Sequence, residues 1–219
     1  MQRSMIFEAH GYKEIRDIGS GACSTVYLVE SIKYRKQFAL KIIDSKKCNL
    51  PVEHEIDSLI GLNHPYIIKM YEFFHVDEFL CIVLQYCPRG SLQDELDEKG
   101  PLNKNDAIVI MRNVIEALNH CHMKQIAHHD IKPGNIFVDE YGRAVLADFG
   151  LSASIDPGKL SQRFVGSRVF MAPEQIRFQM YDPMKADIWA LGVTFYMLLT
   201  GDVPWKLTSL RDLDNSIIS

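Results

Sequence analysis

Short runs in which apolar and polar residues alternate dominate the first part of the chain. The runs span 12–18, 25–30 and 37–43, and Gly-rich or charged residues separate them. Period-two alternation bounded by such residues is typical of antiparallel strands. Two more strand-like runs follow at 67–75 and 79–85. We therefore expect a β-rich segment up to about residue 85.

Helical spacing of apolar residues predicts three helices. The segment 51–62 begins with a helix-compatible proline and carries Val52, Ile56 and Leu59 on one stripe, bordered by Glu55. A second helix starts at Asn103 and Asp106, which form a capping-box-like pattern. Its predicted core positions are Ile108, Met111, Ile115, Leu118 and Cys121. A third helix, 184–199, is apolar nearly all round, which predicts burial at the centre of a helical lobe.

The composition of the chain argues against several classes of protein. The 219 residues are 47% hydrophobic and 24% charged, with a net charge of −4, which argues against general nucleic-acid binding or a basic membrane surface. The five cysteines lack metal-ligand spacing and suggest reduced thiols. The N-terminus lacks the apolar core of a signal peptide, and the longest apolar run, 188–199, is too short to span a bilayer. We expect an intracellular protein located in the cytoplasm, with the nucleus as the alternative.

Candidate chemistry is concentrated in the loop 128–135, which places Asp130, Lys132 and Asn135 between apolar runs. A second carboxylate, Asp148, lies eighteen residues beyond Asp130 at the end of an apolar run. Two acids and an amide could hold a metal-bound phosphate. Four histidines nearby also raise the possibility of a zinc site, but no acidic or cysteine partner completes a ligand set at suitable spacing.

The loop His128-His129-Asp130-Ile131-Lys132-Pro133-Gly134-Asn135 and the later Asp148-Phe149-Gly150 resemble the catalytic loop and magnesium-binding segment of eukaryotic protein kinases. The resemblance implies that Asp130 orients the substrate hydroxyl and that Lys132 neutralises charge on the transferred phosphoryl group. Asn135 and Asp148 would bind Mg²⁺. A lysine two residues after the aspartate is the serine/threonine form.

The small residues Gly19-Ser20-Gly21 open a loop that resembles the phosphate-binding loop of this family, with Ser24 at its third glycine position. Such a loop is a weak signal alone, because an ordinary hairpin turn gives the same pattern. Lys41 follows at the family's interval and would reach the α- and β-phosphates. The resemblance implies that Glu55 pairs with Lys41, with Glu53 as an alternative.

Further residues are assigned to nucleotide binding by the resemblance. The hinge between lobes corresponds to 85–87, where the Gln85 carbonyl and the Cys87 backbone would bond adenine. The slot around the nucleotide would be lined by Ile18, Val26, Ala39 and Phe137. For the apolar members of this set, a simple core role is equally compatible with the sequence.

The segment 151–171 resembles an activation segment with hydroxyls at Ser152, Ser154, Ser161 and Ser167. Ser167 would brace Asp130 and Lys132, and Asp187 would accept backbone hydrogen bonds from the catalytic loop. His129 occupies the position where the family commonly has arginine. Its binding to a phosphorylated residue of the activation segment should therefore be weak. We therefore expect activity to depend little on phosphorylation of the other three serines, which alanine should replace at little cost. The alternative is that His129 packs near Asp148 without a regulatory role.

The sequence is identified as that of a serine/threonine protein kinase, more similar to the calcium/calmodulin-dependent group than to others. The expected fold is α+β and bilobal, with a small antiparallel β lobe at 12–86 and a mainly helical catalytic lobe at 87–219. ATP, Mg²⁺ and a protein substrate are the expected ligands. The closing helices of the large lobe are missing, so a partner chain could cover it. The alternatives are a nucleotide-binding pseudokinase scaffold and a small-molecule kinase.

Overall fold

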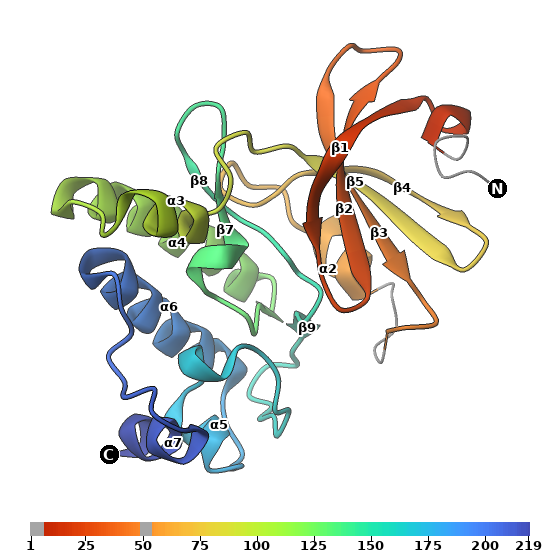
Figure 1. Ribbon diagram of the computed structural model, residues 1–219. Helices are drawn as coiled ribbons and strands as arrows, with labels where there is room; N and C mark the ends of the chain where they lie inside the picture. The colour runs from red at the N-terminus through yellow and green to blue at the C-terminus, as the bar shows by residue number, and fades with distance from the viewer. Residues whose placement is uncertain (1–6, 49–53) are drawn as a thin grey trace. The chain divides into compact units, whose positions relative to one another are not determined.

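The computed structural model describes residues 7–48 and 54–219, which fold as two compact units (Figure 1). The first unit comprises the described residues up to 60 together with 68–86. The second comprises 61–67 and 87–219. Among the described residues, no helix is both long and apolar enough to cross a membrane.

A five-stranded antiparallel sheet forms most of the first unit. Its strands are β1 (Tyr12–Ser20), β2 (Ser24–Ser31), β3 (Gln37–Asp44), β4 (Met70–Val76) and β5 (Phe79–Gln85). Their spatial order is β1-β2-β3-β5-β4. The expected antiparallel start of the chain is confirmed, and the predicted strands match the observed ones to within three residues at each end.

The strand register separates two faces of this sheet. Val26 is opposite Lys41, and Ala39 is opposite Leu84, so these four side chains share one face. The other face is a hydrophobic core that includes Tyr27, Phe38, Leu40 and Cys81, with Phe7 packed into it. The face that carries Lys41 is thereby separated from the core that stabilises the sheet.

The first unit also contains the short helix α2 (His54–Ile60). Ile56 and Leu59 are 3% and 4% exposed, as expected for the apolar stripe. Glu55 is equally buried. The other predicted members of this helix, Pro51 and Val52, lie outside the described residues, and so does the alternative acid Glu53.

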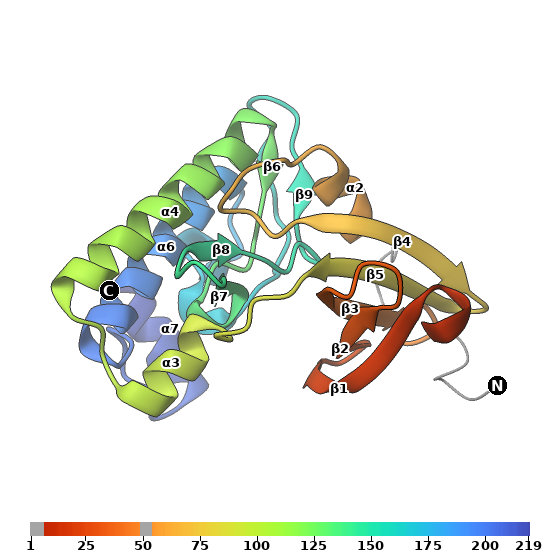
Figure 2. The same ribbon diagram turned by 90° about the horizontal axis from the view of Figure 1, so that it is seen from above.

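Helices are the main regular structure of the second unit. They are α3 (Leu92–Lys99), α4 (Lys104–Met123), α5 (Pro173–Ile176), α6 (Pro183–Thr200) and α7 (Leu210–Ile218). Figures 1 and 2 both show α4 and α6 lying side by side. Two small antiparallel sheets complete the unit: β6 (Ile126–Ala127) with β9 (Ala153–Ser154), and β7 (Ile136–Val138) with β8 (Ala144–Leu146). The α+β class expected from the sequence is confirmed.

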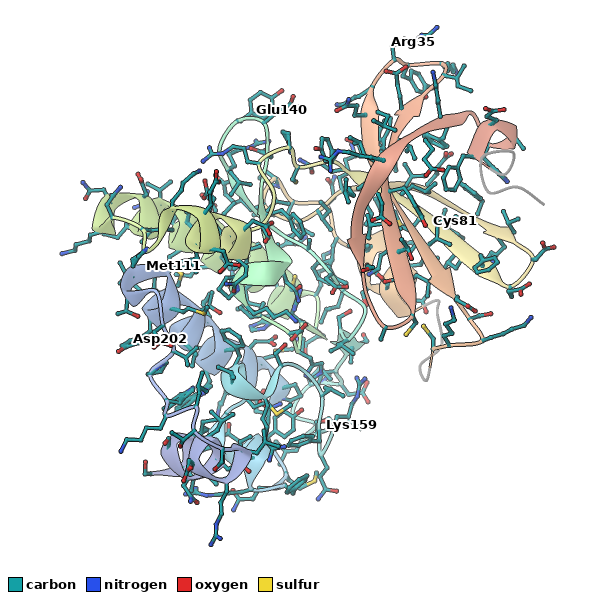
Figure 3. All side chains as sticks on the ribbon, viewed as in Figure 1. Arg35, Cys81, Met111, Glu140, Lys159 and Asp202 are labelled. Atoms are coloured by element: carbon teal, nitrogen blue, oxygen red, sulfur yellow. The ribbon has the colours of Figure 1, made fainter. Side chains whose placement is uncertain are left out.

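The buried face of α4 differs in part from the predicted one. Asn103 caps the helix by accepting hydrogen bonds from the backbone of Asn105 and Asp106. Met111, labelled in Figure 3, is buried, but Ile108 and Ile115 are 45% and 51% exposed. The prediction was wrong for these two residues because α4 carries two apolar stripes at helical spacing. The buried stripe contains Ala107, Ile110, Met111, Val114, Ala117, Leu118 and Cys121.

Helix α6 is not buried all round. Its buried residues include Ala190, Leu191 and Leu198, but Ile188 is 56% exposed and Tyr196 is 45% exposed. The expected burial therefore holds for one side of the helix and not for the other. An apolar composition cannot show which side of a helix its neighbours cover.

Candidate active site

The loop between β6 and β7 is held in place by the buried carboxylate of Asp187, a residue of α6. The backbone N–H groups of His128 and His129 each donate to Asp187, over 2.8 Å. Nε2 of His122 lies 2.9 Å from the same carboxylate, and Asp187 is 2% exposed. Because both oxygens of Asp187 are engaged, the loop is held rigidly before Asp130.

Two neighbouring backbone positions make this loop possible. His129 adopts φ +69°, an uncommon conformation for a residue other than glycine. Gly166 approaches it so closely that a Cβ at position 166 would lie 2.4 Å from the His129 carbonyl oxygen. Gly166 also has φ +101°. This glycine was not predicted from the sequence, although its position directly before Ser167 was a usable signal.

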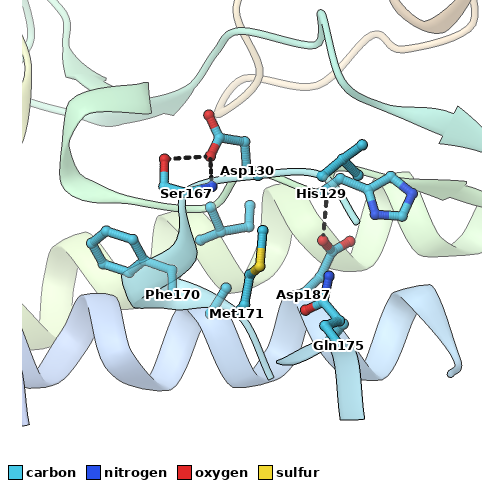
Figure 4. Close-up of a pocket in the computed structure, with 12 residues that line it drawn as sticks. His129, Asp130, Ser167, Phe170, Met171, Gln175 and Asp187 are labelled. Carbon is cyan, nitrogen blue, oxygen red and sulfur yellow. Dashed lines mark hydrogen bonds between the residues drawn. The ribbon is translucent and has the colours of Figure 1, made fainter. Parts of the chain in front are cut away.

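Asp130 is held by a dense hydrogen-bond network and is 8% exposed. Ser167 donates to Oδ1 from both its backbone N–H, at 3.0 Å, and its hydroxyl, at 2.9 Å, as Figure 4 shows. Lys132 Nζ lies 2.7 Å from Oδ2 and 2.9 Å from the Ser167 hydroxyl oxygen. Asn135 donates to Oδ2 over 2.8 Å. The carboxylate therefore has a fixed orientation.

The amide of Asn135 is oriented by the same network. Its nitrogen donates to the Asp130 carbonyl and to the Asp130 carboxylate, over 2.8 Å in each case. The amide oxygen is then the atom of Asn135 that is left to accept. Asp148, just after β8, is exposed and has φ +60°. A carboxylate and an amide oxygen fit a hard cation such as Mg²⁺, which prefers oxygen ligands.

The residues after Asp148 are anchored in the interior. Phe149 is fully buried, and its ring centroid is 4.8 Å from that of His128. The Ser152 hydroxyl donates to the Phe149 carbonyl and is 1% exposed. Unlike an exposed serine, Ser152 therefore stabilises this turn from a buried position.

The first unit contains a buried ion pair. Nζ of Lys41 on β3 lies 2.6 Å from Oε2 of Glu55 on α2. The Lys41 and Glu55 side chains are 12% and 3% exposed. Strand β3 and helix α2 together hold the lysine head in one position. Removing one partner of a buried pair costs about 3–5 kcal/mol because the remaining charge is uncompensated.

The glycine-rich loop joins β1 to β2 as a tight turn. Gly21 donates from its backbone to the Ser24 carbonyl over 2.7 Å, and the Gly19 backbone donates to the Asp17 carboxylate over 3.0 Å. A Cβ at position 21 would contact the Ser24 hydroxyl at 3.3 Å. Ser20 is exposed at the end of β1. Small residues keep the backbone of this turn accessible to a ligand.

The remaining nucleotide-binding candidates are divided between the two units. Ile18, Val26, Ala39 and Gln85 belong to the first unit, and Cys87 and Phe137 belong to the second. The Gln85 backbone donates to the Lys69 carbonyl over 2.8 Å, so its N–H is engaged within the sheet unit. The Cys87 carbonyl accepts from Gly90 over 3.2 Å.

His129 is buried without a partner on its ring. It is 8% exposed, and within the described part of the chain neither ring nitrogen has a hydrogen-bond partner. Burial lowers the pKa of His129 to about 4, and the nearby charge of Arg163 acts in the same direction. His129 also lines a cavity of about 10 Å³, the room of roughly one water molecule (Figure 4). The imidazole is neutral at pH 7.

The activation segment is anchored by contacts that need no phosphate. Ser161 and Tyr181 exchange two backbone hydrogen bonds, at 2.8 and 2.9 Å. Arg168 makes a two-pronged ion pair with Asp214 of α7, at 2.8 and 2.6 Å. The Tyr181 hydroxyl donates to the Arg163 carbonyl over 2.8 Å. Asp214 was not singled out from the sequence, because its distance of 46 residues from Arg168 gives no local signal.

The chain is similar to one family model and to several individual proteins. The family model described as "Protein kinase domain" matches residues 12–218. Sperm motility kinase 2B from Mus musculus is 32% identical over 209 residues, which are 95% of this chain and 43% of that protein. NUAK family SNF1-like kinase 2 from Rattus norvegicus is 35% identical over 215 residues, or 96% of this chain and 34% of that protein. "Probable serine/threonine-protein kinase MARK-B" from Dictyostelium discoideum is 34% identical over 197 residues, 88% of this chain and 28% of that protein. The chain thus spans less than half the length of these relatives.

Proposed function

Since the chain belongs to the protein kinase family, we propose that it transfers the γ-phosphoryl group of ATP to a serine or threonine hydroxyl of a protein substrate. The observation that carries this proposal is the network around Asp130, which fixes one carboxylate by Ser167, Lys132 and Asn135. A pseudokinase does not need a preorganised carboxylate of this kind. No observation favours a scaffold over an enzyme.

Asp130, Lys132 and Ser167 have different roles in the proposed phosphoryl transfer. Asp130 orients the substrate hydroxyl for in-line attack on the γ-phosphorus and accepts its proton, while the bond from that phosphorus to the β-phosphate oxygen breaks and ADP leaves. Lys132 places a positive charge beside that reaction. Ser167 connects both residues, so the pair keeps one geometry throughout the transfer. Positioning of this kind contributes more than any covalent step by the protein.

ATP and Mg²⁺ are the proposed cofactors. Asn135 and Asp148 would hold Mg²⁺, which neutralises charge on the phosphate oxygens when it is bound. Lys41, kept in place by Glu55, would bind the α- and β-phosphates, and the backbone of Gly19, Ser20 and Gly21 would contact phosphate oxygens. The set Ile18, Val26, Ala39, Gln85, Cys87 and Phe137 is proposed for the nucleoside. We take 12–86 as the ATP-binding lobe and 87–219 as the catalytic lobe.

Two wider proposals accompany this function. The five cysteines are free, which supports a reducing location such as the cytoplasm. Apolar side chains at the surface of the second unit, among them Ile188, Leu207 and Leu210, support a partner chain that covers them. The protein substrate itself is not specified by these residues.

Two substitutions test the reaction. Asp130→Asn should abolish transfer to a generic protein substrate and leave magnesium-dependent ATP binding nearly unchanged, because it removes only the orientation of the hydroxyl. Asp148→Asn should abolish transfer and also weaken magnesium-dependent ATP binding. Asp156→Asn is the control, since this side chain is 80% exposed. If Asp130→Asn transfers phosphate as well as the unmodified protein, the assignment of Asp130 is wrong.

A further inference from the structure

Two cysteines far apart in sequence lie together at one end of the sheet in the first unit. Cys23 is in the turn between β1 and β2, and its carbonyl accepts a hydrogen bond from the Asp44 backbone over 2.9 Å. At Asp44 the strand β3 ends, and a turn closed by the Lys47 backbone and the Asp44 carbonyl reverses the chain. Cys48 follows immediately, so the turn returns it toward Cys23.

The Cys23 side chain acts on the ionisation of Cys48, in agreement with the backbone hydrogen bonds that bring the two segments together. Both cysteines are free and partly exposed, whereas Cys81, Cys87 and Cys121 are buried. Among the described residues no group of three or more His, Cys, Asp or Glu side chains could hold a metal. A pair of neighbouring, accessible thiols without a third ligand is suited to oxidation rather than to metal binding.

We propose that Cys23 and Cys48 form a reversible disulfide, and that this bond restrains the glycine-rich loop of the first unit. The bond would tie the loop that contains Gly19 and Gly21 to the connection between β3 and α2. The charge of Lys41 acts on Cys48, so the bond would form near the Lys41–Glu55 ion pair. The restraint on ATP binding rests on the proposed function, but formation of the bond does not.

The reaction needs an oxidant, for which hydrogen peroxide is the simplest. The Cys23 thiolate attacks one peroxide oxygen, the O–O bond breaks, and a sulfenic acid forms with loss of hydroxide. Cys48 sulfur then attacks the sulfenic sulfur and displaces its oxygen, which leaves as water after taking up a proton. In total, two thiols and one peroxide give one disulfide and two water molecules.

The order of these steps follows from the surroundings of Cys48. Burial and the hydrogen bond with Cys23 raise the pKa of the Cys48 thiol to about 11. Cys48 therefore stays protonated at neutral pH, and Cys23 is the sulfur expected to react first. In Cys48→Ser, a sulfenic acid at Cys23 should persist and be trapped by dimedone. In Cys23→Ser, dimedone should not label Cys48 at neutral pH.

The bond itself is tested on the whole chain. Reduced protein is treated with hydrogen peroxide, its free thiols are alkylated, and tryptic peptides are analysed by mass spectrometry. We expect the free thiols to fall from five to three and one cross-link to join Cys23 to Cys48. Dithiothreitol should restore all five. A count that stays at five, or a cross-link between other cysteines, overturns the proposal.

The effect on the loop is tested by ATP kinetics before and after oxidation. A misplacement of about 1 Å in a catalytic group can cost about a hundredfold in rate, so we expect oxidation to lower kcat/KM for ATP by about tenfold or more. Cys48→Ser should keep the reduced activity and be insensitive to peroxide. A complete cross-link with unchanged ATP kinetics overturns the regulatory role. Reduced protein without any transfer activity would instead contradict the proposed function and leave the thiol result standing.

Discussion

The carboxylate of Glu55 has little access to water, and its nearest positive charge is Lys41. Both side chains are nearly buried and lie 2.6 Å apart. An attraction of about 4 kcal/mol is expected for such a pair at an effective dielectric near 20, before desolvation is subtracted. Each residue therefore depends on the other for its position, and substitution of either should affect ATP binding as well as stability.

We expect Glu55→Gln to raise KM for ATP and to lower the free energy of unfolding by about 3 kcal/mol, since it leaves the Lys41 charge without its partner. Urea unfolding and ATP titration measure the two effects. Glu78→Gln is the matched control, because it breaks the surface ion pair with Lys46 at 2.8 Å and should change neither quantity. Equal behaviour of the two variants would exclude a positioning role for Glu55.

His129 makes stability depend on pH. In the folded chain its pKa is lowered from 6.5 to about 4, mainly by burial. The unfolded chain binds the proton first as the pH falls, so this contribution to stability is complete above pH 6.5 and is lost toward pH 4. The fall in pKa corresponds to about 3 kcal/mol over that range.

Urea unfolding at pH 7 and pH 4.5 measures this dependence. His129→Gln removes the titrating group, so the variant should lose less stability on acidification than the unmodified protein. His75→Gln, at an exposed position of β4, should lose as much as the unmodified protein does. If all three proteins respond equally to pH, His129 is not buried in its neutral form.

At the scale of elements, the activation segment carries its own anchors. The Ser161–Tyr181 hydrogen bonds fix the middle of the segment, and the Arg168–Asp214 ion pair fixes its C-terminal part, to other parts of the second unit. A neutral His129 has no charge with which to grip a phosphate. The segment is therefore ordered by contacts that exist before any phosphorylation.

We expect phosphatase treatment to leave most of the transfer activity, and Ser154→Ala and Ser161→Ala to cost little. Ser167→Ala should lower kcat by about a hundredfold while KM for ATP stays nearly constant, because its hydroxyl joins Asp130 to Lys132. Ser167→Thr keeps the hydroxyl and should recover activity. Loss of most activity on dephosphorylation would show that another basic residue replaces the missing arginine.

At the scale of the whole molecule, several large apolar side chains are exposed on the surface of the second unit. On the second unit, Ile188, Leu207 and Leu210 are 56%, 57% and 68% exposed. Exposed apolar side chains at several positions favour association with another chain. This exposure is the basis of the proposed partner.

We expect the isolated chain to bind an apolar dye and to self-associate at high concentration, as measured by fluorescence and sedimentation. Ile188→Lys should reduce both effects. Ile32→Lys places the same charge at an exposed position of the first unit, 48% exposed, and should change neither. A monomer that melts cooperatively and binds no dye would contradict the proposed partner.

Short patterns in the sequence predicted a large part of the fold. The alternation of apolar and polar residues predicted β1, β2, β3 and β5 to within two residues of their observed ends. This works because successive side chains of a strand point to opposite faces, of which one is buried. The polar loop 128–135 and Asp148 were visible for the same local reason: charged residues rarely interrupt apolar runs without a partner. Both the α+β class and the protein kinase family could be read from these short segments.

Only the tertiary structure decided which distant groups meet. The choice between the two apolar stripes of α4 depended on its neighbours, and the sequence favoured Ile108 and Ile115 wrongly. The close approach of Gly166 to His129, the Arg168–Asp214 pair and the contact between Cys23 and Cys48 join residues separated by 25 to 46 positions. Periodicity describes one element at a time. Contacts between elements are fixed by packing and by the need of buried polar groups for partners, and neither has a local signature in the sequence.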